Sequence, residues 1–407
     1  MALLVSIRSS ISSLILAISL AAATIFPAHA AQNPPAIFVF GDSLSDVGTN
    51  NALPDGYHAN HAHYGVDFPG GVATGRFTNG YNFIDGIAQH FGFEQSPPAF
   101  VPVSRGDNHV SKGVNFAHVS KGVNFASGGS GIMVECMDGT AKKCITMDKQ
   151  IDNFKQVRTL LEQLLGSKYM NQLVSNSLFV FTCGSNDLNN FFDKYSCIFP
   201  FAPIDEYVAN LTSAFNSQLR KLYELGGRKF AVINVPALGR IPTARALDVF
   251  NITGINFERV LNGYAQKFNK AEAAMLRELS SSTLPGMKYS IGNAYSVIMD
   301  VTNKPKKYGM KNVVDPCCGN VQFVPALPPV NITYCSPTAW LCSNRSEYAF
   351  WDNIHPTQPV IKYGGELFYS GVPPYATPIN FKQLVGDDQT APRRGASLRG
   401  VGSFEAM

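Results

Sequence analysis

Short runs of β-branched and aromatic residues alternate with longer amphipathic stretches along most of this 407-residue chain. This alternation restricts the fold more than any other feature, because strands joined by helices form a mainly parallel sheet with helices on its faces. The sequence therefore predicts an α/β protein, with one domain rather than two. The expected strands are 36–40, 122–126, 177–183, 229–235 and 288–293, and the expected helices are 151–165, 204–225 and 256–279.

The composition excludes two classes of protein. Hydrophobic residues make up 45% of the chain and charged residues 15%, against about 25% charged in ordinary soluble domains, so disorder is not the general state. The 33 basic and 29 acidic side chains leave a formal charge of +4 with no basic block. A charged face for nucleic acid has no support.

The first thirty residues are typical of a secretory signal peptide. They carry Arg8, no acidic residue, an apolar run over 14–26 and then Ala28-His29-Ala30. The apolar run is shorter than the ~20 residues that a bilayer requires, which disfavours a transmembrane span, and no other segment is long and apolar enough. We expect cleavage after Ala30, one folded domain over 31–385, and a flexible tail over 386–407, where Gly, Ser, Ala, Asp and Arg predominate.

Secretion would expose the 8 cysteines to an oxidising compartment, and an even number suits disulfides. Sequence alone suggests only that Cys136 with Cys144, and the cluster over 317–342, close local loops. Zinc is the alternative, but the chain has no CxxC pair and adjacent Cys317-Cys318 is poor ligand spacing. Four sequons predict a glycosylated surface, at Asn210, Asn251, Asn331 and Asn344.

A candidate nucleophile follows the first expected strand. In Ile37-Phe-Val-Phe-Gly-Asp-Ser-Leu-Ser-Asp46 the strand runs into Gly41-Asp42-Ser43. A serine just past the carboxyl end of a parallel strand has its hydroxyl at the open edge of the sheet. From this segment alone, Ser43 could equally cap the following helix.

A candidate base lies near the other end of the chain, in Trp351-Asp-Asn-Ile-His-Pro-Thr357. A serine hydroxyl needs a base to take its proton, and a histidine oriented by a carboxylate is the usual one. Asp352 and His355 are three positions apart, so one tight turn can bring the carboxylate to Nδ1 while Nε2 faces Ser43. A surface aspartate near a histidine is common, so the pair alone is weak evidence for a catalytic site. The serine at the end of the first expected strand strengthens that interpretation.

Two middle segments offer donors to the oxyanion of an acyl-transfer intermediate. Gly122-Val-Asn-Phe-Ala-Ser-Gly-Gly-Ser-Gly131 enters a glycine turn whose N–H groups can approach a substrate. Phe181-Thr-Cys-Gly-Ser-Asn-Asp187 follows another strand and presents the Asn186 amide. Taken singly, the glycines could supply turn dihedrals and Asn186 could cap a helix.

Taken together, these segments resemble the GDSL esterase/lipase family of SGNH hydrolases, and in particular its secreted plant branch. The matching motifs are FGDSLSDVG, GRFTNG, GVNFASGGSGI, GSND, the Cys317-Cys-Gly segment and WDNIHPT. The resemblance extends from about residue 36 to residue 384.

The resemblance implies a three-layer α/β/α sandwich with a mainly parallel, flavodoxin-like sheet, and neither a metal nor an organic cofactor. It implies Ser43 as nucleophile, His355 as base and acid, and Asp352 as the residue that orients His355. The oxyanion donors would be the Ser43 N–H, a glycine N–H and the Asn186 side chain. We choose Gly128 over Gly129 because it directly follows Ser127, although the motif fits either.

The implied function is a secreted esterase or lipase of the cell wall or apoplast, acting on a small-molecule, lipid or polysaccharide ester. An acyltransferase using the same residues, or a catalytically impaired binding protein of the wall, are the alternatives. The chain contains no GxSxG, which disfavours the α/β-hydrolase fold. His58, His61 and His63 have metal-like spacing, but we expect a solvent-facing polar loop there.

One departure from the family pattern is a tandem repeat, since residues 109–117 recur unchanged as 118–126. The second copy runs into Ser127, so we expect it to form the strand and the first copy to be extruded as a loop beside the oxyanion turn. Two longer interruptions, 54–78 and 305–344, are rich in Gly, Pro, Asn and Cys and predict loops over the sheet edge.

Overall fold

A computed structural model describes residues 33–101, 121–134, 136, 142–196, 203–249, 256–323 and 330–386. The fold below belongs to the unit Pro34–Met407. The expected signal peptide, the first copy of the repeat and all of the expected tail except Gly386 lie outside the described residues. Within the described ranges, no helix combines the length and the apolar character needed to cross a membrane.

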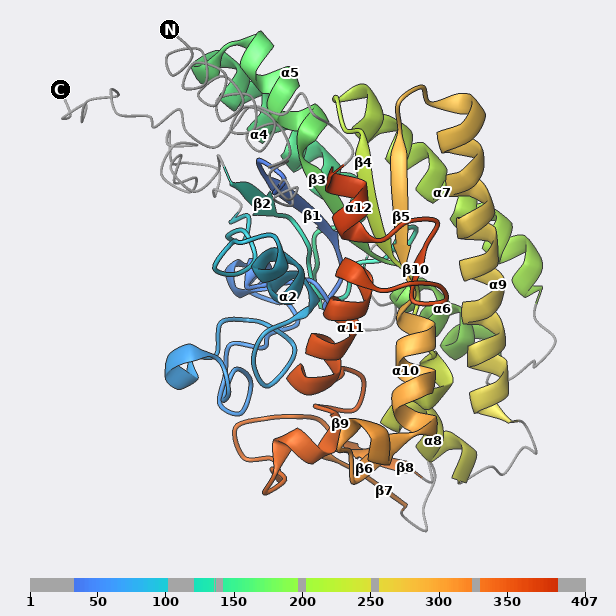
Figure 1. Cartoon of the computed structure of the whole chain (residues 1–407). Helices are drawn as coiled ribbons and strands as arrows, with labels where there is room; N and C mark the ends of the chain where they lie inside the picture. Colours follow the sequence, from blue (N-terminus) through green and yellow to red (C-terminus); the bar gives the residue numbers. More distant parts are fainter. Residues whose placement is uncertain are drawn as a thin grey trace, which may run out of the picture. The chain divides into compact units, whose positions relative to one another are not determined.

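The centre of the fold is a sheet with the strand order β10-β5-β4-β3-β1-β2 (Figure 1). Its strands are β1 (Ile37–Gly41), β2 (Gly122–Asn124), β3 (Leu178–Thr182), β4 (Lys229–Ile233), β5 (Lys288–Gly292) and β10 (Ala376–Thr377). The first five strands are parallel, and β10 pairs antiparallel with β5. The order 2-1-3-4-5 is that of flavodoxin-like folds, in which ligands bind where the order reverses, between β1 and β3.

Two groups of helices flank this sheet and complete an α/β sandwich. One group contains α2, α11 and α12, and the other contains α4, α7 and α9 (Figure 1). The helices are α2 (Phe83–His90), α4 (Met147–Leu165), α5 (Ser167–Asn176), α6 (Ser185–Phe191), α7 (Ile204–Glu224), α8 (Pro242–Val249), α9 (Phe257–Glu278), α10 (Ala294–Asn303), α11 (Gln358–Ser370) and α12 (Phe381–Gly386).

Phenylalanines on alternate positions of β1 and β3 form the centre of the core. Phe38 and Phe40 on β1 lie on the same face of the sheet as Phe179 on β3, because side chains two positions apart on a strand point the same way. All three pack against Phe154 of α4, with ring centroids 4.9, 5.9 and 5.4 Å away. This packing fixes the strands whose ends carry Ser43 and Asn186.

The five expected strands are confirmed, each within two residues at either end. The second copy of the repeat forms β2, as expected, and pairs with β1 from Gly122 onward. The three expected helices are also confirmed, although α4 begins at Met147 rather than at residue 151. Thr146 caps that helix by accepting a hydrogen bond from the Lys149 N–H, which the apolar spacing alone did not indicate.

The prediction of a loop over 305–344 is wrong in part. This stretch contains β6 (Asn312–Pro316), β7 (Asn320–Phe323) and β8 (Val330–Thr333), and β6 pairs with β9 (Tyr348–Phe350). The composition of this stretch is typical of a loop, so it did not predict these strands. The short segments are held together by disulfides that join Cys317 to Cys342 and Cys318 to Cys335. We call residues 312–323 and 330–357 the disulfide lobe. Residues 54–78 contain neither an α-helix nor a strand, as expected.

Candidate active site

Ser43 lies on a tight turn directly after β1. Gly41 ends the strand with φ +145°, and a Cβ there would stand 2.1 Å from the Thr182 carbonyl oxygen, so only glycine fits beside β3. The Asp42 carbonyl then accepts the N–H groups of Ser45 and Asp46. The turn leaves Ser43 partly exposed, at the carboxyl end of the sheet.

The structure brings the three residues of the expected triad together. Nε2 of His355 lies 2.7 Å from Oγ of Ser43. Nδ1 of His355 lies 2.9 and 2.8 Å from the two carboxylate oxygens of Asp352. Burial acts to raise the pKa of the Asp352 carboxyl, but the charge and hydrogen bonds of His355 outweigh burial and hold this pKa below its usual value. The arrangement suits transfer of the Ser43 proton to His355.

The turn that carries Asp352 and His355 is anchored in the disulfide lobe. The Trp351 N–H donates to the His355 carbonyl at 2.7 Å and closes the turn. The backbone N–H groups of Cys317 and Cys318 donate to the carbonyls of Phe350 and Trp351. Both cysteines are disulfide-bonded, so covalent links hold the strand from which the turn departs.

The glycine turn after β2 differs from expectation at Gly128. The Gly128 N–H donates to Oδ2 of Asp46 at 2.9 Å, so it is not available to an oxyanion. Gly129, the other glycine that the motif allows, has φ +88° and makes no backbone hydrogen bond through its N–H within the described part of the chain. The sequence could not separate the two, because the partner of Gly128 lies 82 positions away.

Asn186 is the second residue of α6, which follows β3 after a short turn. Its Nδ2 donates one hydrogen bond to the Ser130 carbonyl at 2.8 Å, which ties α6 to the glycine turn and leaves a second amide hydrogen. The neighbouring Asp187 carboxylate accepts the N–H groups of the three residues after that turn, Ile132, Met133 and Val134. The turn and α6 therefore form one rigid unit.

Ser43, Asn186 and His355 share one pocket, and the rest of its lining is mainly apolar. The apolar side chains that line the pocket come from the Ser43 turn, α2, the segment after β4, α10 and the disulfide lobe. They include Leu44, Phe83, Leu238, Ile241, Ile298 and Ile354. Asp42 also lines this pocket, and burial raises the pKa of its carboxyl to about 7, against hydrogen bonds from Leu44 and Thr182 that lower it.

Several residues that support this site from behind carry no signal in the local sequence pattern. Gln150 of α4 binds both the N–H and the carbonyl of Gly41, at 2.8 and 2.9 Å. The Phe77 ring packs 5.2 Å from the His355 ring, and the Tyr64 hydroxyl donates to Asp352. Phe77 belongs to the motif GRFTNG, but the motif does not indicate which residues the Phe77 ring contacts.

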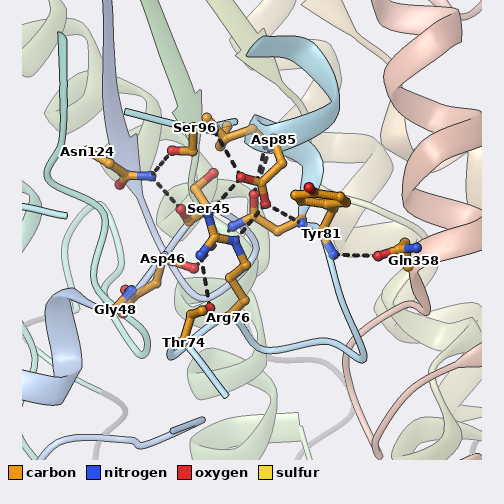
Figure 2. A network of polar contacts seen from close by, with 12 residues as sticks. Ser45, Asp46, Gly48, Thr74, Arg76, Tyr81, Asp85, Ser96, Asn124 and Gln358 are labelled. Atoms are coloured by element: carbon orange, nitrogen blue, oxygen red, sulfur yellow. Dashed lines mark hydrogen bonds and ion pairs between the residues drawn. The ribbon is translucent and has the colours of Figure 1, made fainter. Parts of the chain in front are cut away.

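Figure 2 shows the polar network around residues 74–85, the segment that contains Phe77. Arg76 and Asp85 form a buried bidentate ion pair at 2.7 Å. The Tyr81 N–H donates to Gln358 at the start of α11, and Asn124 of β2 donates to the Ser45 carbonyl. The network therefore joins four segments that are far apart in sequence: the turn after β1, residues 74–85, β2 and the start of α11.

The three spaced histidines do not converge. His58 bonds to the Leu53 carbonyl and His61 to the Ala62 carbonyl, while Nε2 of His63 is buried without a partner in the described part of the chain. All three side chains are half-buried rather than solvent-facing as expected. Among the residues described, no group of three or more His, Cys, Asp or Glu side chains is placed to hold a metal ion.

Six cysteines are paired, including Cys136 with Cys144 as suggested. Among the described residues, Cys183 is a buried thiol outside any disulfide, directly after β3. Cys197 lies outside the described residues. Of the sequon asparagines, Asn210 and Asn344 are exposed, Asn331 lies in β8, and Asn251 is outside the described residues.

Comparison with known proteins extends over most of the chain. Residues 37–360 match the family model described as GDSL-like lipase/acylhydrolase. GDSL esterase/lipase At4g16230 from Arabidopsis thaliana is 35% identical, over 88% of this chain and 92% of the relative. GDSL esterase/lipase At1g74460 from the same plant is 36% identical, over 79% of this chain and 82% of the relative. GDSL esterase/lipase At5g55050 is 34% identical, over 86% and 90%.

Proposed function

Since the chain belongs to the GDSL-like lipase/acylhydrolase family and is a carboxylic ester hydrolase, we propose that it cleaves esters through an acyl-enzyme on Ser43. The observation that carries this proposal is the continuous chain of contacts from Ser43 Oγ through His355 to Asp352, at 2.7 and 2.8 Å. These are the distances that proton transfer from a serine to an oriented histidine needs.

In this mechanism Ser43 Oγ attacks the ester carbonyl while His355 Nε2 takes its proton. Asp352 keeps the Nδ1 proton on the far side of the ring and stabilises the imidazolium. The tetrahedral intermediate collapses as His355 returns the proton to the departing alcohol. Water then attacks the acyl-enzyme with His355 again as base, and the carboxylic acid leaves Ser43.

Three donors would stabilise the oxyanion: the N–H of Ser43, the N–H of Gly129 and the Nδ2 of Asn186. Gly129 takes the place of Gly128 because Asp46 occupies the Gly128 N–H. The hydrogen bond from Asn186 to Ser130 supports this set, because it holds the side chain beside the glycine turn. Fixed donors cost no reorganisation when the charge develops.

The substrate would be a small-molecule or lipid ester with an aliphatic part, since the pocket beside Ser43 is lined mainly by apolar side chains. Secretion remains a proposal, supported by the three disulfides, which persist in oxidising compartments. The exposure of Asn210 and Asn344 is compatible with glycosylation at those sequons.

The test is hydrolysis of p-nitrophenyl esters from acetate to palmitate by the secreted full chain. We expect kcat/KM to rise from acetate to longer acyl chains. Ser43→Ala and His355→Ala should each lower kcat by about 10⁴-fold or more, and Asp352→Asn somewhat less, while secretion continues. A matched Ser45→Ala variant leaves the triad in place and should remain active. Wild-type rates in Ser43→Ala would refute the acyl-enzyme.

A further inference from the structure

The Asp352 carboxylate has a hydrogen-bond donor from the opposite end of the chain. The hydroxyl of Tyr64 donates to Oδ2 of Asp352 at 2.8 Å, across 288 positions of sequence. Tyr64 lies in the loop before α2 and is 7% exposed. Its ring packs edge-on against Phe77 and Trp351, with centroids 6.2 and 6.3 Å away, so the hydroxyl is aimed by packing.

The two carboxylate oxygens have different partners. Oδ1 accepts the N–H groups of Ile354 and His355, at 2.9 and 2.8 Å, within the tight turn. Oδ2 accepts the Tyr64 hydroxyl, and both oxygens face Nδ1 of His355. Without Tyr64, Oδ2 would keep only His355 as a hydrogen-bond partner among the described residues, while the side chain stays buried. A carboxylate with a lone pair left unsatisfied in that way gains from rotating toward another donor.

We propose that Tyr64 is a positioning residue for the reaction, which fixes the rotation of the Asp352 carboxylate and moderates its hold on His355; this rests on the proposed function of Ser43. A phenol donates one strong hydrogen bond to a carboxylate and draws off part of its negative charge. This hydrogen bond therefore weakens the attraction between the Asp352 carboxylate and the His355 imidazolium that forms during the reaction.

Tyr64 is suited to this role because it stays protonated. Burial, the Asp352 charge and the hydrogen bond to Asp352 together raise the pKa of the Tyr64 hydroxyl well above its usual value. Two other titratable groups lie close to Tyr64 or to His355. The His61 ring packs edge-on against Tyr64 at 5.0 Å, and the Asp42 carboxyl interacts electrostatically with His355.

The test is Tyr64→Phe in the full chain, since phenylalanine keeps the ring packing and removes the hydroxyl alone. We expect kcat for p-nitrophenyl esters to fall about tenfold, the scale of one hydrogen bond to a charged group, with KM within about twofold. The carboxylate becomes more basic without its donor, so the acidic limb of the pH profile should move to higher pH by about half a unit. Tyr348→Phe is the matched control, because Tyr348 packs against the same small cluster without contacting Asp352.

A readout independent of activity separates this inference from the proposed function. NMR titration of the His355 ring, assigned by its loss in His355→Gln, should move to higher pH in Tyr64→Phe and stay in place in Tyr348→Phe. In an Asp352→Asn background, Tyr64→Phe should change kcat less than twofold. An unchanged His355 titration, or an equal loss of kcat in both backgrounds, overturns the role of Tyr64. Full activity in Ser43→Ala overturns the acyl-enzyme but leaves the titration as a test.

Discussion

The two halves of the active site are stabilised in different ways. Ser43 and Asn186 follow β1 and β3, whose phenylalanines belong to the large core of the sheet. Asp352 and His355 lie in the disulfide lobe, on a small cluster that contains Tyr64, Phe77, Trp351 and four half-cystines. One half depends on extensive apolar burial, and the other on covalent links around few apolar side chains.

Because their stabilisation differs, the two halves can be perturbed separately by experiment. The register of β1 and β3 positions Ser43 and Asn186 at the ends of these strands, whereas His355 lies in the disulfide lobe. We therefore expect that unfolding the lobe would withdraw His355 from Ser43 and leave the sheet intact. The chain has 2 tryptophans, Trp340 and Trp351, and both belong to the disulfide lobe. Tryptophan fluorescence therefore reports on the lobe that carries Asp352 and His355.

The largest effect should come from removing the lobe disulfides. Cys317→Ala with Cys342→Ala opens a link across 25 positions and should cost the lobe about 3 kcal/mol. Adding Cys318→Ala with Cys335→Ala should abolish esterase activity and shift the tryptophan emission to the red, with far-UV circular dichroism largely kept. The Cys136→Ala, Cys144→Ala protein is the control and should keep its tryptophan spectrum. Full activity without both lobe links would contradict the comparison.

The next effect tests the sheet half. Asn186→Ala should lower kcat about a hundredfold, the scale for losing one oxyanion donor, with the tryptophan spectrum unchanged. Asn190→Ala on the same helix, outside the pocket, is the control and should remain near wild type. If the turnover of the two variants is the same, Asn186 does not belong to the oxyanion site.

A smaller effect concerns the core behind the sheet. Glu272 of α9 is fully buried, and burial raises the pKa of its carboxyl to about 8. Between pH 4.5 and about 8 the folded state therefore keeps a proton on Glu272 that the unfolded chain has released. The contribution of this protonated carboxyl to the free energy of unfolding is fully present below about pH 4.5 and is lost as the pH rises toward 8. In Glu272→Gln this loss, followed by urea unfolding with circular dichroism, should shrink by about 1.4 kcal/mol for each pH unit between the two pKa values. An unchanged pH slope would show that Glu272 is ionised in the fold.

The smallest effect should come from deleting residues 109–117. The remaining copy still supplies β2 beside β1, and shortening a connection changes its closure entropy little. Activity should stay within about twofold of wild type, and the unfolding temperature should not fall. A loss of activity greater than tenfold would mean that the first copy contributes to the glycine turn.

The sequence predicted the parts of the fold that depend on local pattern. Strand β1 and the position of Ser43 follow from an apolar run and a glycine turn, and the Asp352–His355 spacing predicts their contact. Three hydrogen bonds of the site join residues 82, 109 and 288 positions apart: Gly128 to Asp46, Gln150 to Gly41, and Tyr64 to Asp352. No local pattern encodes such contacts, and the strands of the lobe were missed because their pairing depends on disulfides.

The central claim is that Ser43 forms the covalent intermediate, and active-site labelling tests it most directly. The full chain would be treated with a fluorophosphonate at neutral pH, digested and analysed by mass spectrometry. We expect one adduct on the peptide that contains Ser43, absent in Ser43→Ala and formed at least about a thousandfold more slowly in His355→Ala. An adduct on another residue, or esterase activity that survives complete labelling of Ser43, would contradict this claim.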